Sequence, residues 1–141
     1  MMEIMKKLPK KNRWGFTLIE LMVVVGIVAL LVALSMPSYQ QFIRKSKRGE
    51  AQKLMLNYAN VQEIWRSTHN TYASATDMVP PTYLDDQGNN LYTFAVSGIS
   101  TTGFTLTATA QGTQALDKDK GQACTALTLT QAALKGPAAC W

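Results

Sequence analysis

The sequence predicts an α+β protein in which a long, kinked N-terminal helix packs on a small antiparallel β-sheet. Three observations support this prediction. An apolar run long enough to cross a membrane begins at residue 16. Apolar residues then recur at every third or fourth position up to about residue 66, and at every second position from near residue 92. The length of 141 residues suits one domain plus a targeting or anchoring segment.

The predicted helix extends from Phe16 to about Arg66. Its first part, Phe16 to Met36, has 21 residues and at about 1.5 Å per residue covers roughly 31 Å, enough for the hydrocarbon core of a bilayer. Pro37 lacks a backbone N–H and clashes with the preceding turn, so we expect a kink or a locally loosened turn near residues 33–37. The second part is amphipathic, and the stripe of mostly apolar side chains along one of its faces should pack on a soluble head. The stripe comprises Ala51, Leu54, Met55, Tyr58, Val61, Gln62 and Trp65.

The remainder of the chain has the pattern of a loop followed by strands. Residues 71–90 are rich in Pro, Asp, Asn and Gly, which favours turns with room for a short helix. Apolar and polar residues then alternate around residues 92–96, 104–110 and 127–130. This alternation predicts three strands with one apolar and one threonine-rich face. The apolar face should cover the stripe on the helix.

The N-terminus has a basic leader that ends in Gly15 and is followed by Phe16. An ordinary secretory signal places its apolar segment before the cleavage site, whereas a cut between Gly15 and Phe16 would keep that segment in the mature protein. The alternative is a conventional signal cut after Ser35, which Pro37 and Glu20 disfavour. The formal charge of +5 belongs mainly to the leader, whose net charge is +4. Its basic residues are Lys6, Lys7, Lys10, Lys11 and Arg13.

The residues from Gly15 to Met22, Gly-Phe-Thr-Leu-Ile-Glu-Leu-Met, resemble the start of type IV pilins. The resemblance implies a prepilin leader at 1–15, a membrane and filament-core helix at 16–43, and a soluble head at 44–141 that ends in a disulfide-bounded loop. It also implies a prepilin peptidase that cleaves before Phe16 and methylates the new amino group. The implied partners are other pilin subunits in a helical filament and an inner-membrane assembly platform.

Glu20 is a single carboxylate within the apolar run. Such a group costs about 2.5–3.5 kcal/mol at mid-helix, and less near the helix end, so it needs a partner. The resemblance implies that this partner is the N-terminal ammonium of Phe16 in a neighbouring subunit, which would set the register of assembly. The alternative is an interfacial carboxylate near the lipid headgroups.

Two cysteines, Cys124 and Cys140, follow the predicted export segment. The chain has no C-x-x-C pair and a single histidine, which argues against zinc. An exported head favours a disulfide between them, the alternative being two free thiols. Together with the terminal Cys140-Trp141, the segments 104–110 and 124–129 resemble those of small minor pilins from Gram-negative bacteria.

No catalytic constellation or cofactor motif is evident in the sequence, so we expect no enzyme activity, cofactor or metal. His69 fits a helix end or a surface position. The segments 85–90 and 117–120 contain oxygen ligands, but they fit solvated loops better than a Ca²⁺ site. The basic cluster from Arg44 to Arg48 fits a helix that leaves a bilayer better than a phosphate contact.

The resemblance implies a structural subunit, a minor pilin that contributes to pilus assembly, adhesion, twitching motility or DNA uptake. It would cross the inner membrane once, with a cytoplasmic N-terminus and a periplasmic head, before it enters the extracellular pilus. The alternatives are a major pilin, a DNA-binding competence pilin or a type II secretion pseudopilin. Beyond Arg66 the head has three basic residues against five aspartates, which disfavours direct nucleic-acid binding.

Overall fold

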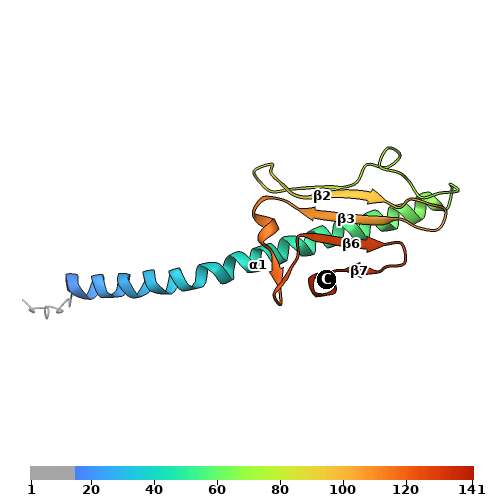
Figure 1. Ribbon diagram of the computed structural model, residues 1–141. Helices are drawn as coiled ribbons and strands as arrows, with labels where there is room; N and C mark the ends of the chain where they lie inside the picture. The colour runs from blue at the N-terminus through green and yellow to red at the C-terminus, as the bar shows by residue number, and fades with distance from the viewer. Residues whose placement is uncertain (1–14) are drawn as a thin grey trace, which may run out of the picture. The chain divides into compact units, whose positions relative to one another are not determined.

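The computed structural model describes residues 15–141, and residues 1–14 of the leader expected at 1–15 lie outside this range. The chain divides into two units, one that ends at Met36 and one from Pro37 to Trp141. The second unit combines the C-terminal half of one long helix with an antiparallel sheet (Figure 1). The predicted α+β fold is therefore confirmed.

The helix α1, Leu18–Arg66, begins with a side-chain cap. The backbone N–H of Glu20 donates to the hydroxyl oxygen of Thr17 at 3.3 Å, and the N–H of Leu21 donates to the Thr17 carbonyl at 3.2 Å. Thr17 is thus the N-cap, and the sequence Thr-Leu-Ile-Glu has the spacing of a capping box. The helix therefore begins two residues later than predicted from the apolar run.

The helix remains α-helical through Pro37 and ends at Arg66. The kink expected at Pro37 stays a prediction. At the C-terminal end, the Arg66 guanidinium donates to the carbonyl oxygens of His69 at 2.8 Å and Thr101 at 3.1 Å. These bonds tie the end of the helix to the loop before β3.

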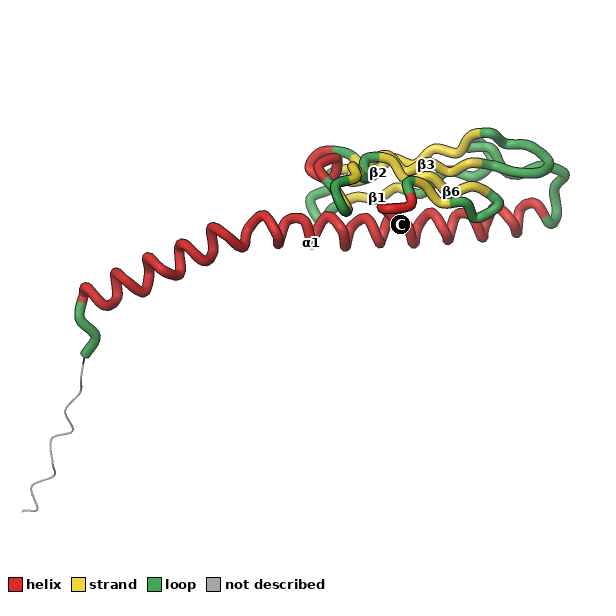
Figure 2. The backbone as a smooth tube through the Cα atoms, turned by 60° about the horizontal axis from the view of Figure 1, so that its bottom comes forward, coloured by secondary structure: helices red, strands yellow, loops and turns green. Residues whose placement is uncertain are grey.

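The main sheet is antiparallel and has the strand order β1-β2-β3-β6-β7. Its strands are β1 (Thr82–Leu84), β2 (Asn90–Ser97), β3 (Thr105–Ala110), β6 (Ala126–Thr130) and β7 (Lys135–Gly136). A hairpin of β4 (Lys118–Asp119) and β5 (Gln122–Ala123) forms a second sheet, and two 3₁₀ helices are η1 (Gly112–Leu116) and η2 (Ala138–Cys140). The three predicted strands correspond to β2, β3 and β6. The tube view shows the sheet as a layer along the second half of α1 (Figure 2).

The core forms between this sheet and one stripe of α1. The helix buries Arg48, Ala51, Met55, Tyr58 and Gln62. The strands bury mainly Tyr92, Leu106, Ala108, Leu127 and Leu129.

The predicted stripe is correct at four of its seven positions and wrong at Val61, which is 39% exposed. Gln62 is fully buried because its side-chain amide donates to the Ala73 carbonyl at 2.9 Å and accepts from the Ala73 N–H at 2.8 Å. A buried amide needs such partners.

The predicted loop over residues 71–90 contains the short strand β1, and the short helix allowed there does not form. Pro80 and Pro81 precede β1, and proline cannot donate to a ladder. The turn after β1 is organised by Asp85, whose carboxylate accepts from the N–H groups of Gln87 at 2.9 Å and Asn89 at 2.8 Å. The hydrogen bond from the Asn89 side chain, and then these backbone bonds, lower the pKa of Asp85.

The predicted disulfide between Cys124 and Cys140 is present, with a sequence separation of 16. It joins η2 to the chain just before β6. The Cys140 carbonyl accepts from the Gln52 side chain on α1 at 2.6 Å, so the closed loop is also attached to the helix. The Trp141 indole N–H donates to the Gly136 carbonyl at 3.0 Å, and the Lys135 ammonium lies 4.8 Å from the Trp141 ring centroid.

Replacing both cysteines with serine is expected to lower the melting temperature of the full chain in neutral detergent. A disulfide closing a loop of this length contributes about 3 kcal/mol in the chain-entropy description, which corresponds to a shift on the order of 10 °C for a domain of this size. Circular dichroism on heating measures the shift. The matched control is the wild-type chain with its disulfide reduced, which should melt close to the variant; an unchanged melting temperature in both would contradict a stabilising bond.

Candidate functional site

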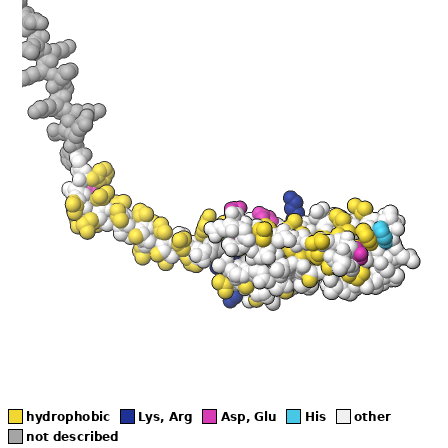
Figure 3. Space-filling view, turned by 90° about the horizontal axis from the view of Figure 1, so that it is seen from above, with side chains coloured by type: hydrophobic (Ala, Val, Ile, Leu, Met, Phe, Trp, Pro, Cys, Tyr) yellow, Lys and Arg dark blue, Asp and Glu magenta, His cyan; other side chains and the backbone are white. Residues whose placement is uncertain are grey.

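The first candidate surface is the apolar part of α1. Every described residue from Gly15 to Gln40 is exposed, and the space-filling view shows apolar side chains along this segment (Figure 3). Among residues 15–141, α1 is the helix that is long and apolar enough to cross a membrane by length and composition. A contiguous apolar surface of this extent is typical of a segment that is covered by a bilayer or by partner helices.

The N-terminal motif lies where this helix starts. Gly15 and Phe16 precede the cap residue Thr17 and lie outside regular structure, and Phe16 is 83% exposed. A peptidase can therefore reach the bond between Gly15 and Phe16 without opening a helix.

Glu20 lies in the first turn of α1, where a carboxylate is favoured by the helix dipole. A cut after Gly15 would place the new ammonium of Phe16 at the same positive helix end. The negative charge of Glu20 would then compensate both the helix dipole and this ammonium. Sequence reasoning assigned Glu20 to assembly but missed Thr17. The T-x-x-E spacing is the signal that would have identified it.

The second feature is a cluster of charged side chains that joins the β4–β5 hairpin to α1. The Arg48 guanidinium lies 2.7 Å from an Asp117 carboxylate oxygen and 2.5 Å from one of Asp119. The Lys45 ammonium also contacts Asp119, at 3.2 Å. The Gln41 amide donates to the other Asp117 oxygen at 3.1 Å and also to the Lys118 carbonyl. All buried polar side-chain atoms of the described chain have a partner.

The cluster corrects the interpretation of 117–120 as a solvated loop. Asp117 is 0% exposed and Arg48 is 3% exposed, so both belong to the core. Asp119 is part-exposed, and its hydrogen bonds with Lys45 and then Arg48 lower the pKa of its carboxyl. No local pattern in the sequence indicates a pair whose members are 69 residues apart.

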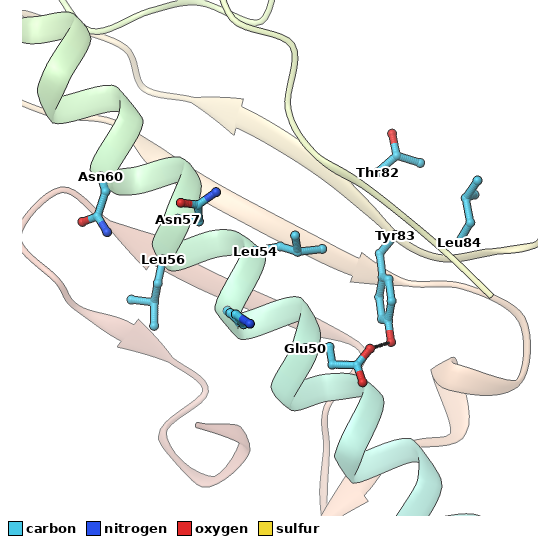
Figure 4. Close-up of a pocket in the computed structure, with 9 residues that line it drawn as sticks. Glu50, Leu54, Leu56, Asn57, Asn60, Thr82, Tyr83 and Leu84 are labelled. Atoms are coloured by element: carbon cyan, nitrogen blue, oxygen red, sulfur yellow. Dashed lines mark hydrogen bonds between the residues drawn. The ribbon is translucent and has the colours of Figure 1, made fainter. Parts of the chain in front are cut away.

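An open groove of about 890 Å³ lies between α1 and β1. Leu54, Leu56 and Leu84 give it apolar walls, with Tyr83 and Glu50 at one end (Figure 4). The Tyr83 hydroxyl donates to the Glu50 carboxylate. Burial first, and then this carboxylate, raise the pKa of Tyr83. The leucine side chains suit the groove to an apolar surface.

His69 lies just after the end of α1, as predicted, and its ring stacks on Trp65 with 3.8 Å between ring centroids. Among residues 15–141 no group of three or more His, Cys, Asp or Glu side chains is arranged to hold a metal ion. In the segment 85–90, the oxygens of Asp85 are used by the turn itself.

Comparison with known protein families gives two matches that together cover residues 10–128. Residues 10–36 match the model described as the prokaryotic N-terminal methylation motif, a range that contains Gly15, Phe16 and Glu20. Residues 37–128, more than half of the chain, match the model described as type IV minor pilin ComP, DNA uptake sequence receptor.

Curated relatives match over shorter stretches. The prepilin peptidase-dependent protein D of Escherichia coli is 42% identical over 55 residues, which cover 39% of this chain and 38% of that protein. The type IV major pilin protein PilA of Myxococcus xanthus is 33% identical over 87 residues, 62% of this chain and 38% of that protein. The matched part thus spans less than two fifths of these relatives. No solved structure matches the chain.

Proposed function

Because this chain belongs to the type IV pilins, within the family of the minor pilin ComP, we propose that it is a minor subunit of a type IV pilus. The proposal is supported by one combination of features: a methylation motif and an exposed apolar helix segment are followed in the chain by a region that matches the ComP family. Its role is structural: it helps to assemble or adjust the filament and so serves adhesion, twitching motility or DNA uptake. It performs no chemistry of its own.

Processing precedes assembly in this proposal. The prepilin peptidase removes residues 1–15 and methylates the amino group of Phe16. The accessible Gly15–Phe16 bond and the capped helix start at Thr17 support this order, because cleavage leaves the helix intact. Residues 16–43 then form the membrane and filament-core helix, and residues 44–141 form the head.

Before assembly the protein crosses the inner membrane once, with its N-terminus in the cytoplasm and its head in the periplasm. The assembly platform then moves it into the filament beside other pilin subunits. There Glu20 pairs with the Phe16 ammonium of a neighbouring subunit. The Glu20 carboxylate needs a counter-charge when it leaves the membrane for the filament. Only one axial offset between neighbouring subunits places the Phe16 ammonium beside it.

Quantitative mass spectrometry of sheared pili from the source bacterium tests the minor role. We expect this chain in the filament fraction at a small fraction of the most abundant pilin, and fewer pili after its deletion. If it is the most abundant subunit, it is a major pilin. If it is missing from pili and its deletion blocks protein secretion instead, it is a pseudopilin and the proposal fails.

Direct DNA binding is a second candidate, and the family description favours it. The excess of aspartates over basic residues beyond Arg66 argues against DNA binding. In the folded head this excess is reduced, because Arg48 and Lys45 pair with Asp117 and Asp119. Fluorescence anisotropy of labelled duplex DNA with the full chain in neutral micelles tests this candidate. Binding that weakens steeply with salt and depends on DNA sequence would support it, whereas binding without sequence preference would leave only the structural role.

A further inference from the structure

A second, smaller hollow of about 320 Å³ lies beside residues 39–47 of α1. Two basic side chains, Arg44 and Lys47, line it together with Tyr39, Ile43 and Thr113. We propose that this hollow binds the phosphate headgroup of an anionic phospholipid while the protein is in the membrane. This inference rests on the proposed pilin function, because it requires a membrane-inserted chain. The hollow is called the headgroup pocket below.

The charges of the headgroup pocket suit an anion. Arg44 and Lys47 are three residues apart and therefore share a helix face, and both are half-buried. Neither makes an ion pair within residues 15–141. An arginine and a lysine on one face are a common arrangement for binding phosphate oxygens, since the guanidinium offers paired donors and the ammonium a compact charge.

The aspartates of the β4–β5 hairpin are engaged by other cations: Asp117 and Asp119 bind Arg48, and Asp119 also binds Lys45. On its other side Lys47 borders a hollow that is also lined by Glu50, Asp85 and Asp86. Glu50 accepts a hydrogen bond from the Tyr83 hydroxyl, and Asp85 accepts hydrogen bonds from its own turn. The charge of Lys47 is one of the causes that lower the pKa of Asp85. None of the described residues that line the headgroup pocket is acidic, so the charge of Arg44 is left for a ligand and that of Lys47 is shared with these acids.

The wall of the pocket is fixed by a buried residue. The Gln114 side chain is 1% exposed, and its amide donates to the Arg44 carbonyl at 2.8 Å and to the Tyr92 hydroxyl at 3.1 Å. The first bond holds η1 against α1 and the second holds it against β2, so that Thr113 borders the pocket beside the basic residues. Because the wall of the pocket is already fixed, it loses little conformational entropy when a ligand binds.

The position along the chain favours a lipid over another phosphate. The apolar run from Phe16 to Met36 covers about 31 Å, the thickness of a hydrocarbon core. Tyr39 and Phe42 follow this run and are 63% and 67% exposed, and aromatic side chains are enriched at membrane interfaces. Arg44 follows Met36 by eight residues, about 12 Å along the helix. Helical side chains incline toward the N-terminus, here toward the bilayer, so the long arginine side chain reaches back toward the headgroups.

Native mass spectrometry of the full chain tests the proposal. The protein is released from neutral micelles that contain equal amounts of phosphatidylglycerol and phosphatidylcholine with the same acyl chains. We expect phosphatidylglycerol to be retained preferentially. Each basic side chain near an anionic surface contributes roughly a factor of five, so the variant Arg44→Gln/Lys47→Gln should lower the retained ratio by about 25-fold.

Two matched variants make the result specific. Lys53→Gln/Lys135→Gln removes the same charge from other parts of the head and should keep the wild-type ratio. Arg44→Lys keeps both charges and should lose much less than the double glutamine variant. The proposal is overturned if the double glutamine variant retains the wild-type ratio, or if the Lys53 and Lys135 control loses as much.

Competition separates the possible sources of phosphate. Excess inorganic phosphate should leave the lipid ratio unchanged; if it removes phosphatidylglycerol selectively, the pocket binds free phosphate. If duplex DNA binds with the same dependence on Arg44 and Lys47 and excludes the lipid, the pocket is part of a DNA surface. Either result overturns the lipid proposal. Resistance of the wild-type chain to alkaline extraction from membranes is measured in parallel. If the wild-type chain resists extraction but shows no preference for phosphatidylglycerol, this inference is refuted while the proposed pilin function stands.

Discussion

Glu20→Ala is expected to enter the membrane as well as the wild-type chain and yet to be nearly absent from filaments. Removing a carboxylate from an apolar segment makes insertion easier. In the filament, the same change leaves the Phe16 ammonium of a neighbour without its counter-charge. Losing one partner of a buried charge pair costs about 3–5 kcal/mol, so incorporation should fall at least 100-fold. Quantitative immunoblots of the membrane and sheared-pilus fractions measure the two pools.

Two controls separate the charge from the helix cap. Glu20→Gln keeps the size of the side chain but not its charge and should fail like Glu20→Ala. Thr17→Ala removes the hydroxyl that accepts from the Glu20 N–H; it should cost about 1 kcal/mol of helix stability and assemble far better. Incorporation of Glu20→Ala at the wild-type level beside wild-type subunits would refute the proposed role.

Arg48→Met is expected to destabilise the head by about 3–5 kcal/mol, because it leaves Asp117 buried and without its cation. The free energy of unfolding is measured with urea in neutral detergent, followed by near-ultraviolet circular dichroism. Lys45→Met removes an exposed partner of Asp119 and should cost no more than about 1 kcal/mol.

The double variant Arg48→Met/Asp117→Leu should recover much of the loss, since apolar residues of similar size often replace a buried ion pair without penalty. Equal stability of Arg48→Met and wild type would show that the pair does not hold the β4–β5 hairpin to α1. Failure of the double variant to recover would show that Asp117 acts through other bonds, of which the contact with Gln41 is the first candidate.

The predictable parts of the fold have local periodic signals. Alternation identified β2, β3 and β6 because one face of each strand packs on the helix and the other carries threonine or other small residues. The strand β1 has three residues and was missed, since so short a stretch has no measurable period. The disulfide could be predicted because the chain has two cysteines that follow a predicted export segment.

The residues of the candidate site also fall into two groups, those with a local sequence signal and those brought together only by folding. Gly15, Phe16 and Glu20 fall within one short motif, so the sequence alone is enough to propose them, and their roles stay predictions. The pair of Arg48 and Asp117 depends on how the hairpin folds back on the helix, and either residue alone looks like a surface charge. The headgroup pocket likewise combines two distant segments, α1 and η1, so only the folded chain reveals it.

Mass spectrometry of the N-terminal peptide of the protein isolated from bacterial membranes tests the central claim most directly. The account predicts a mature chain that begins at Phe16 with a methylated amino group. A Gly15→Leu variant should accumulate uncleaved, since it replaces the small residue at the cut. A mature chain that begins at Met36, after a conventional cut behind Ser35, would lack the apolar helix and would contradict the assignment as a pilus subunit.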